Sequence, residues 1–371
     1  MNKNEKIRIG LVGTGFIGKG YVQAVEWQDD IEIVKVLTRR KINECSSFPR
    51  EDLLTNSMEE LIDHSDMIME CSGDIVHATD VIAQAFTANL PVVTMDAEVH
   101  VTTGSYFAGK GILTEAEGDQ PGCLAAVYED ALSMGFTPLV LGNVKGFQNL
   151  NPSLSDMEFW AKKQGLSLPM VTASTDGTKL QFEQALLANG FDTHITQTGL
   201  TGIETDHLEK SALELAQLAK QLGAPISDYI IMPNCSARVF LVVEHHVNQK
   251  ANLEYFKLGK GPFYVLTHNT NLCHLEISKT VRRVRDGRGV LLNNSESPGV
   301  SVASVAKEDL KKGTSILTGC GSFELRGSAV NIKENIGHLP IGLVKNCVIK
   351  NNVEAGQILT MDDVELPESL A

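Results

Sequence analysis

The sequence lacks three features: a long apolar run, an excess of positive charge and closely spaced cysteines. No stretch approaches the roughly 18 consecutive apolar residues of a membrane-spanning helix, so we expect no membrane partner. The 46 acidic residues outnumber the 32 basic ones and give a net charge of -14, which argues against binding along a nucleic-acid backbone. A small basic pocket for a phosphorylated metabolite is compatible with this charge. We therefore expect a small-molecule substrate and no nucleic-acid partner.

The cysteines form neither a CxxC pair nor a spacing typical of a zinc site. They stand at Cys45, Cys71, Cys123, Cys235, Cys273, Cys320 and Cys347. Scattered cysteines in odd number are typical of buried, reduced thiols in a cytoplasmic protein. The start, "MNKNEKIRIGLVGTG", has a short charged lead and then resembles a first strand rather than a signal peptide. We expect a cytoplasmic protein in which cysteine chemistry plays no part.

The length and the order of the apolar segments predict several domains. A chain of 371 residues exceeds the size of a single core. Its first third alternates strands and helices, which is typical of a parallel sheet. The predicted strands are "KIRIGLVG", "IEIVKVLTRR", "SDMIMECSG", "LPVVTMD", "GILTEA" and "TPLVLGN". We therefore predict an α/β protein with an N-terminal Rossmann domain over residues 1–148, completed by about 255–292. A central α+β domain over 149–254 would bind substrate and form a homo-oligomer.

The C-terminal part, residues 295–371, is predicted to be a small β-rich domain. The segment "NNSESPG" (293–299) is the natural linker to it. "AKEDLKKGTSIL" (306–317) and "IKNNVEAGQILT" (349–360) form a weak repeat, each copy a turn that enters a short strand. The repeat holds no convergent set of titratable groups, so we do not expect the catalytic centre there.

The turn "VGTGFIGKG" predicts a dinucleotide site. Its GxGxxG pattern follows an apolar strand and opens a helix, as the dinucleotide fingerprint requires. Gly13 permits the tight turn, Gly15 lets the pyrophosphate approach the backbone, and Gly18 lets the helix pack on the strand. The alternative is an ordinary glycine-rich turn. The predicted cofactor contacts here are Gly13, Thr14, Gly15, Phe16, Ile17 and Gly18, joined by Cys71, Ser72 and Gly73 after the third strand.

The end of the second strand, "VLTRRK", favours NADP(H) over NAD(H). An NAD site usually has an acidic residue here for the ribose 2′-hydroxyl. This chain has Thr38, Arg39 and Arg40 instead. A hydroxyl and two guanidiniums suit a 2′-phosphate, which arginine can bind with two hydrogen bonds. The alternative is that both arginines are solvated loop residues.

The stretch "VLGNVKGFQN" (140–149) ends an apolar strand on a lysine. Because ligands bind at the carboxyl ends of strands in α/β enzymes, we expect Lys145 at the ligand-binding edge of the first sheet. Its ammonium group would meet a carbonyl or phosphate oxygen of the substrate, and Asn143 on the same strand would also contact substrate. The segments "MDAEVH" and "EGDQPG" are expected to converge at the same edge.

The stretch "TASTDGTKLQFEQ" predicts a second basic site at the start of a helix. Asp176 and Gly177 form a turn, and Thr178 and Lys179 follow in the first helical turn. A lysine there is unfavourable to the helix dipole, which suggests that an anion compensates for it. The alternative is a surface lysine. Neither Lys145 nor Lys179 has an obvious acidic neighbour in sequence, so we expect each to be solvated or bound to an anion.

Several further charged residues are candidates for the site. Asp119 lies ahead of proline and glycine, either as a catalytic acid or as a helix N-cap. Asp96 and Glu98 in "MDAEVH" can bind a divalent metal or act as acids, but their spacing is diagnostic of no particular ion. The metal is therefore left open. Arg238 is a candidate for substrate binding, alongside Asn143, Asp176 and Thr178.

Five segments together resemble a known family: "EGDQPG", "TPLVLGNVKGFQ", "DGTKLQFEQALLANG", "KLGKGPFY" and the tail "LPIGLVKNCVIKNNVEAGQILTMDDVEL". Over nearly the whole chain they resemble the homoserine-dehydrogenase-like NAD(P)-dependent oxidoreductases with a C-terminal SAF domain, a small β-clip fold. Within that group the chain looks most like the DXR-like proteins, which reduce and isomerise 1-deoxy-D-xylulose 5-phosphate. The resemblance implies NADPH on the Rossmann half and a phosphorylated or hydroxylated keto substrate near Lys145 and Lys179.

Two departures argue against homoserine as the substrate. The chain reads "VVTMDAE" where homoserine dehydrogenases carry an "ANK"-like lysine, and "GNVKGFQN" replaces their "NGTTNY"-like segment. We therefore expect an NADPH-dependent oxidoreductase of a small polar, phosphorylated keto compound, in which Lys145 or Lys179 polarises the carbonyl oxygen. The alternatives are an amino-acid or hydroxy-acid dehydrogenase, and a non-catalytic module that binds a nucleotide or a sugar.

Overall fold

The structure, a computed structural model, describes residues 6–371 and divides into two compact units. The first unit contains the chain up to Gly122, together with Leu272–Glu296 and Ser369–Ala371. The second contains Cys123–Asn271 and Ser297–Glu368. Helix α6 (Gln120–Ser133) leads the chain from the first unit into the second. Nowhere in residues 6–371 is a helix both apolar and long enough to cross a bilayer.

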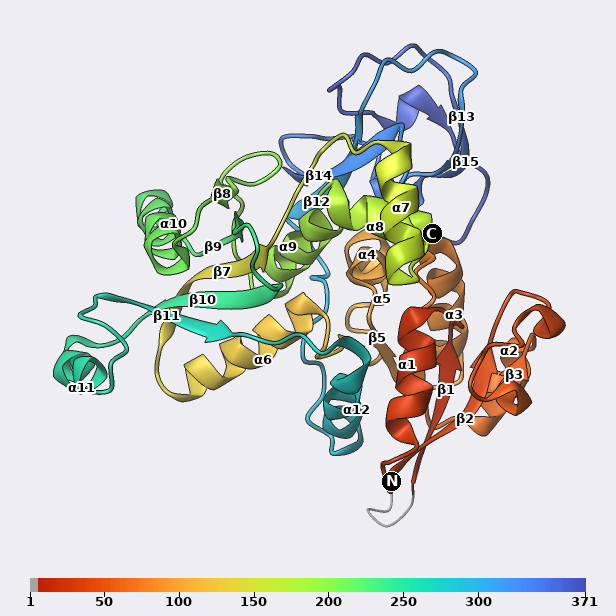
Figure 1. Cartoon of the computed structure of the whole chain (residues 1–371), viewed down its shortest axis with the longest axis horizontal. Helices are drawn as coiled ribbons and strands as arrows, with labels where there is room; N and C mark the ends of the chain where they lie inside the picture. The colour runs from red at the N-terminus through yellow and green to blue at the C-terminus, as the bar shows by residue number, and fades with distance from the viewer. Residues whose placement is uncertain (1–5) are drawn as a thin grey trace. The chain divides into compact units, whose positions relative to one another are not determined.

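The first unit is built on a parallel six-stranded sheet with the order β3-β2-β1-β4-β5-β6 (Figure 1). Its strands are β1 (Ile7–Val12), β2 (Ile31–Leu37), β3 (Leu54–Thr55), β4 (Met67–Glu70), β5 (Val92–Thr94) and β6 (Leu113–Glu115). Its helices are α1 (Phe16–Val25), α2 (Met58–His64), α3 (Ile75–Thr87), α4 (Ala97–Val99), α5 (Ser105–Phe107) and α12 (Ile277–Arg285), with a π-helical turn at His100–Gly104. The predicted α/β class and the Rossmann-like parallel sheet are confirmed.

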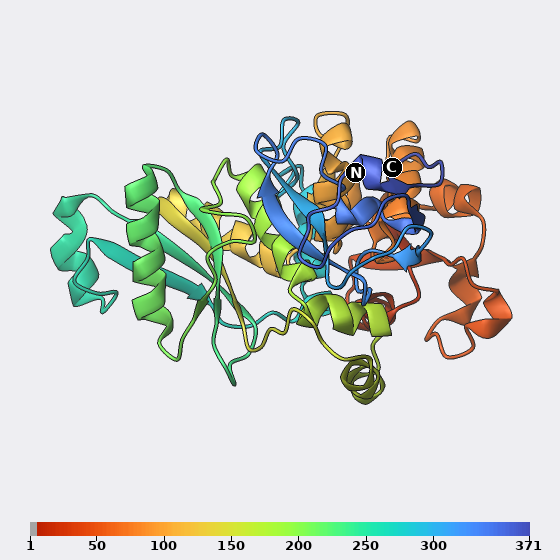
Figure 2. The same cartoon turned by 90° about the horizontal axis from the view of Figure 1, so that it is seen from above.

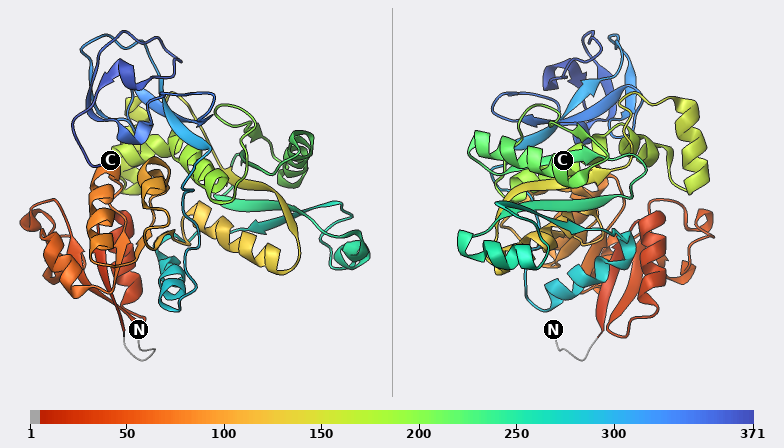
Figure 3. Two further views of the ribbon diagram at one scale, coloured as in Figure 1. Left: turned by 180° about the vertical axis from the view of Figure 1, so that it is seen from behind. Right: turned by 60° about the vertical axis from the view of Figure 1, so that its left-hand side comes forward.

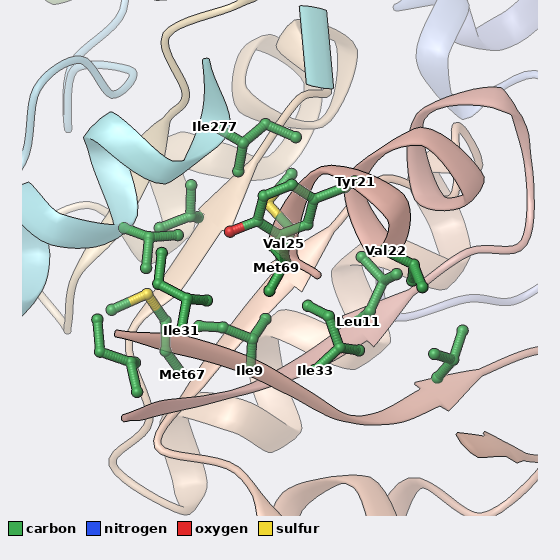
Figure 4. Close-up of a cluster of buried hydrophobic side chains, with 14 of the residues drawn as sticks. Ile9, Leu11, Tyr21, Val22, Val25, Ile31, Ile33, Met67, Met69 and Ile277 are labelled. Atoms are coloured by element: carbon green, nitrogen blue, oxygen red, sulfur yellow. The ribbon is translucent and has the colours of Figure 1, made fainter. Parts of the chain in front are cut away.

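One face of this sheet packs against α1 and α12. Alternate strand residues point to the same face, and Ile9, Leu11 and Ile33 meet Tyr21 of α1 and Ile277 of α12 in one buried cluster (Figure 4). A fully buried apolar side chain of this size stabilises the fold by about 1.5–3 kcal/mol. Through this packing α12, which lies far along the chain, contacts the first strands of the sheet.

A polar contact also ties α12 to the start of β2. The Asp30 carboxylate accepts hydrogen bonds from Arg282 at 2.7 and 2.8 Å and from Arg285 at 2.8 Å. These guanidiniums hold the pKa of Asp30 well below its usual range. The carboxylate is therefore ionised in any neutral solution.

The second unit contains a mixed five-stranded sheet with the order β11-β10-β7-β9-β8. Its strands are β7 (Thr137–Lys145), β8 (Ile203–Glu204), β9 (Ile226–Ile231), β10 (Arg238–Glu244) and β11 (Phe263–His268). The expectation that the strand ending at Lys145 belongs to the first sheet is wrong. It pairs antiparallel with β10 along almost its whole length and parallel with β9. An apolar run predicts a buried strand, but it does not reveal which strands lie beside it.

Two helices cover opposite faces of the second sheet. These are α9 (Thr178–Gly190) and α10 (Leu208–Leu222), and Figure 2 shows α10 beside this sheet. Val144 packs in a cluster with Ala212 and Leu215 of α10, whereas the neighbouring Asn143 bonds to α9. Successive strand residues point to opposite faces. Nearly all of α9 is buried, so it is the central helix of this unit. The other helices of the unit are α7 (Leu154–Gln164), α8 (Leu168–Thr175) and α11 (Lys250–Tyr255).

The tail forms two small sheets, β12-β14 and β13-β15-β16, and β12 and β14 lie against α9 (Figure 3). The strands are β12 (Val300–Ala306), β13 (Ser315–Thr318), β14 (Leu325–Asn331), β15 (Lys345–Ile349) and β16 (Val364–Glu365). The two copies of the predicted repeat pair with each other. Leu310 and Val353 exchange backbone hydrogen bonds of 2.8 and 2.9 Å. At equivalent positions of the two copies, the Gly313 N–H donates to the Ile349 carbonyl oxygen and the Gly356 N–H donates to the Ala306 carbonyl oxygen, each at 2.8 Å. The repeat is therefore a symmetric pair of turns.

Candidate active site

The glycine-rich turn of the first unit has the geometry of a dinucleotide site. Gly13 has a φ of 112°, which other residues rarely adopt. A Cβ on Gly18 would collide with the Gly13 carbonyl oxygen, so only glycine lets α1 pack this closely on β1. A Cβ on Gly15 would meet no atom within 4 Å. The backbone at Gly15, the N-cap of α1, is thus open to an approaching pyrophosphate, as this fingerprint requires.

A pocket of about 410 Å³ opens beside the end of β2. Asn56 shapes its wall by donating to the carbonyl oxygens of Thr38 and Arg40 at 2.5 and 2.9 Å. Arg39 forms an ion pair with Asp74 at 2.7 Å while its side chain stays half exposed. The lining residues are Leu37, Thr38, Arg39, Arg40, Lys41, Asn56, Met58, His77, Asp80, Val81 and Gln84. Three cations, Arg39, Arg40 and Lys41, therefore line this pocket together with Thr38.

The segment after β4 contains the predicted cofactor contacts Cys71, Ser72 and Gly73, and a carboxyl that the sequence analysis missed. Glu70 accepts hydrogen bonds from the backbone N–H of Ser72 at 2.8 Å and from Thr94 at 3.1 Å. Burial raises the pKa values of the Glu70 carboxyl and of the Cys71 thiol. The Cys71 thiol is therefore protonated at neutral pH. Glu70 could have been found in the sequence as the acidic residue that ends the apolar strand "MIME".

Asp96 and Asp119 both lie beyond the carboxyl ends of strands in the first unit. Asp96 caps α4 by accepting from the Val99 N–H at 3.3 Å, and Asp119 is buried just before α6. His100, which the analysis of "MDAEVH" did not select, is buried with its ring nitrogens 2.8 Å from Asn293 Oδ1 and 3.3 Å from Glu115 Oε2. Burial lowers the pKa of His100 to about 4. The imidazole is therefore neutral at physiological pH.

The second unit brings Lys145 and Asn143 of β7 onto one carboxylate of α9. Lys145 Nζ lies 2.9 and 3.2 Å from the two oxygens of Glu183, and Asn143 Nδ2 donates to Glu183 Oε2 at 2.7 Å. Glu183 is completely buried, whereas a fifth of the Lys145 side chain is exposed. Lys145 was expected to be solvated or bound to an anion, because no acidic residue lies near it in the sequence; in the structure its partner is the Glu183 carboxylate. Glu183 belongs to the quoted helix segment, but only the pairing of β7 with α9 reveals its role.

The start of α9 is fixed by Asp176 and Thr178. Asp176 accepts from the Thr178 N–H at 2.9 Å and pairs with Lys307 of the tail at 2.7 Å. Burial raises the pKa of Asp176, and the Lys307 ammonium opposes this rise. Thr178 Oγ1 accepts from the Gly327 N–H at 2.8 Å. Both residues thus join the tail to α9, and their contact with a substrate stays a prediction.

Lys179 and Arg238 differ in their relation to Lys145. Lys179 lies one helical turn before Glu183, so both side chains follow the same face of α9. Arg238 pairs in register with Val144, whose side chain faces α10. Arg238 therefore points to the opposite face of the sheet from Lys145 and does not join it. The alternation of side chains along β10 shows which of its residues share a face, but only the register of β10 with β7 shows which face that is.

Residues 118–277 match the family model described as "Oxidoreductase DRL, catalytic domain". This segment includes Lys145, Lys179 and Glu183. Two curated proteins are similar over parts of the chain. Meso-diaminopimelate D-dehydrogenase of Acetivibrio thermocellus is 35% identical over 71 residues, 19% of this chain and 21% of that protein. Glyceraldehyde-3-phosphate dehydrogenase of Methanococcoides burtonii is 25% identical over 181 residues, 44% of this chain and 49% of that protein. The chain thus spans half or less of the length of these relatives.

Solved dehydrogenase structures are similar at a greater distance. A myo-inositol dehydrogenase from Corynebacterium glutamicum is 13% identical, with a TM-score of 0.46 over 76% of this chain and 90% of that one. Dihydrodipicolinate reductase from Paenisporosarcina sp. is 14% identical, with a TM-score of 0.41 over 77% of this chain and 97% of that one. At this distance neither carries over a substrate. The chain is thus similar, over residues 118–277, to an oxidoreductase catalytic domain, and its first unit has a Rossmann-like sheet with a glycine-rich turn.

Proposed function

We propose that the protein is an NADPH-dependent reductase of a small, polar, phosphorylated keto compound. The observation that carries this proposal is the Lys145–Glu183 pair, which lies in the segment that matches an oxidoreductase catalytic domain. A lysine at a strand end, held by a buried carboxylate and still partly exposed, is suited to donate a proton to a substrate oxygen. A reductoisomerase of the 1-deoxy-D-xylulose 5-phosphate type is one reaction of this class.

The choice of NADPH rests on the pocket at the end of β2. Arg39, Arg40 and Lys41 supply three positive charges there, and no acidic residue follows β2 where an NAD enzyme usually has one. Asp74 neutralises part of the charge of Arg39, but a guanidinium has five donors and retains others for a phosphate. The pocket therefore favours a cofactor that carries a 2′-phosphate.

In the proposed reaction, bound NADPH supplies a hydride to the carbonyl carbon of the substrate. Lys145 Nζ donates a hydrogen bond to the carbonyl oxygen and then transfers its proton, which leaves a hydroxyl group and a neutral amine. Glu183 holds the Lys145 ammonium group in place through contacts of 2.9 and 3.2 Å. Asn143 holds the Glu183 carboxylate in place. The exposed part of Lys145 allows the amine to regain its proton from solvent.

The proposal is tested by NADPH oxidation against a panel of phosphorylated keto sugars and their dephosphorylated forms, and by NADP⁺ reduction with several amino and hydroxy acids. We expect turnover with a phosphorylated ketone, a clear preference for NADPH over NADH, and little turnover without the phosphate. The Lys145→Met variant keeps the apolar stem and should lose at least ~2 kcal/mol of transition-state stabilisation, with nearly unchanged NADPH affinity. Turnover of an amino or hydroxy acid alone would instead support that alternative dehydrogenase class.

A further inference from the structure

We propose that Arg326 of the tail, together with Tyr229 of β9, binds the phosphate group of the substrate. This inference rests on the proposed function and names the residues that would recognise the phosphorylated end. It also assigns the tail a direct part in substrate binding, although the tail repeat holds no convergent set of titratable groups. Arg326, Tyr229 and the Lys145–Glu183 pair all belong to the second unit.

The position of Arg326 is fixed because β14 is bonded to α9 directly after this residue, at Gly327 and Ala329. The Gly327 N–H donates to Thr178 Oγ1 at 2.8 Å, and the Ala329 N–H donates to Gln181 Oε1 at 2.8 Å. Both acceptors lie in the first turn of α9. The backbone of Arg326 is therefore held beside the start of the helix that carries Glu183.

The side chain of Arg326 lies on the side of β14 that faces the Gly199–Gly202 loop. Arg326 and Ser328 share one side because alternate strand residues point the same way, and the Ser328 hydroxyl lies 3.2 Å from the position of a Cβ on Gly199. The same loop reaches Tyr229, whose ring leaves no room for a Cβ on Gly202. Arg326 and Tyr229 are also close enough to interact electrostatically.

Arg326 is a half-buried guanidinium that makes no hydrogen bond or ion pair to any residue between 6 and 371. Burial lowers its pKa, and the negative charge of Asp176 opposes this effect. Asp176 is already engaged by Lys307 and by the Thr178 N–H. Leaving several guanidinium donors unsatisfied in a partly buried position is costly. An oxyanion would supply the missing acceptors.

Tyr229 provides a second donor and connects this position to the reacting end. Its hydroxyl lies 3.2 Å from Gln148 Oε1, a contact that an arriving anion can replace or share. Tyr229 pairs in register with Asn143 on the adjacent strand, at the usual strand separation of about 4.8 Å, and Asn143 contacts Glu183. A small phosphorylated ketone would thus reach from Arg326 toward Lys145. The fork of a guanidinium matches a phosphate monoester, which can accept several hydrogen bonds at once.

The test is calorimetric binding of inorganic phosphate to the full chain saturated with NADP⁺, which occupies the cofactor's own phosphate site. Acetate at matched ionic strength is the comparison anion. We expect phosphate to bind, Arg326→Gln to weaken it at least tenfold, Arg326→Lys to retain part of the affinity, and Tyr229→Phe to weaken it severalfold. Lys333→Gln removes an exposed charge elsewhere in the tail and should change nothing. Circular dichroism checks that each variant is folded.

Unchanged phosphate affinity in folded Arg326→Gln, or no phosphate binding by the unaltered protein, would overturn the inference. Equal affinity for acetate would overturn the assignment to a phosphate. Because this assay involves no hydride transfer, its failure is distinct from failure of the proposed reaction. With an active substrate, Arg326→Gln should raise KM far more than it lowers kcat, whereas Lys145→Met should chiefly lower kcat.

Discussion

Replacing Lys145 by methionine should reduce stability as well as activity, because Glu183 would become a buried carboxylate with only part of its partners. Glu183 has no exposed surface, and Lys145 Nζ contacts both of its oxygens. Removing one member of a fully buried ion pair costs about 3–5 kcal/mol. A fifth of Lys145 is exposed, and Asn143 still donates to the carboxylate. We therefore expect a loss of about 2–3 kcal/mol in the free energy of unfolding.

The double variant Lys145→Met/Glu183→Gln separates this stability effect from catalysis. It removes both charges and leaves an amide that can still accept from Asn143, so most of the lost stability should return. Activity should not return, because no acid remains beside the substrate carbonyl. Urea unfolding at pH 7 measures the first quantity, and NADPH oxidation measures the second. The reasoning fails if the single variant is as stable as the unaltered protein, or if the double variant is no more stable than the single one.

Three further results are expected. Changing Arg39 to Asp and Arg40 to Ser should reverse the preference for NADPH, measured by cofactor titration; equal affinity of the unaltered protein for NADPH and NADH would contradict the assignment. Asp30→Asn should cost about 1 kcal/mol at pH 7, a value already reduced for the partial exposure of the carboxylate. Because the pKa of Asp30 is lowered in the folded protein, this contribution is present above its unfolded pKa near 4 and is lost as pH falls further. Urea unfolding of both proteins from pH 7 to pH 2 checks that the difference shrinks, and a constant difference would be inconsistent with it. Asp176→Asn should destabilise the second unit by about 3 kcal/mol by leaving Lys307 buried without its carboxylate, and addition of Lys307→Met should restore part of that loss in thermal unfolding; a further loss would be contrary to this account.

The parts of the fold that depend on nearby residues could be predicted from the sequence. The glycine-rich turn follows from the steric demands of Gly13 and Gly18 on the chain next to them. The alternation of strands and helices in the first 115 residues likewise follows from apolar periodicity and turn residues. The pairing of the tail repeat was only implicit in the similarity of its halves. Leu310 and Val353 show that each half supplies the partner of the other.

The parts that depend on distant segments could not be predicted. β7 has the apolar composition of a central strand in any sheet, and only its register with β10 and β9 assigns it to the second one. Glu183 looks like an ordinary helix residue until β7 places Lys145 and Asn143 beside it. Arg238 seemed a substrate residue, but its register with Val144 directs it to the other face. Arg326 could not be selected as a candidate, because its local sequence does not show that the guanidinium is half-buried and lacks hydrogen-bond acceptors among residues 6–371.

The most direct test of the central claim is a single-turnover reaction with NADPH deuterated at C4 of the nicotinamide, using the preferred phosphorylated ketone from the panel. Mass spectrometry of the product determines whether the deuterium has moved to carbon, and a parallel fluorescence titration gives the dissociation constant for NADPH. We predict one deuterium in the alcohol product, transferred at least about 30-fold more slowly by Lys145→Met, the rate equivalent of ~2 kcal/mol, with nearly unchanged NADPH affinity. Absence of deuterium from every product, or transfer by Lys145→Met at the unaltered rate, would contradict the account.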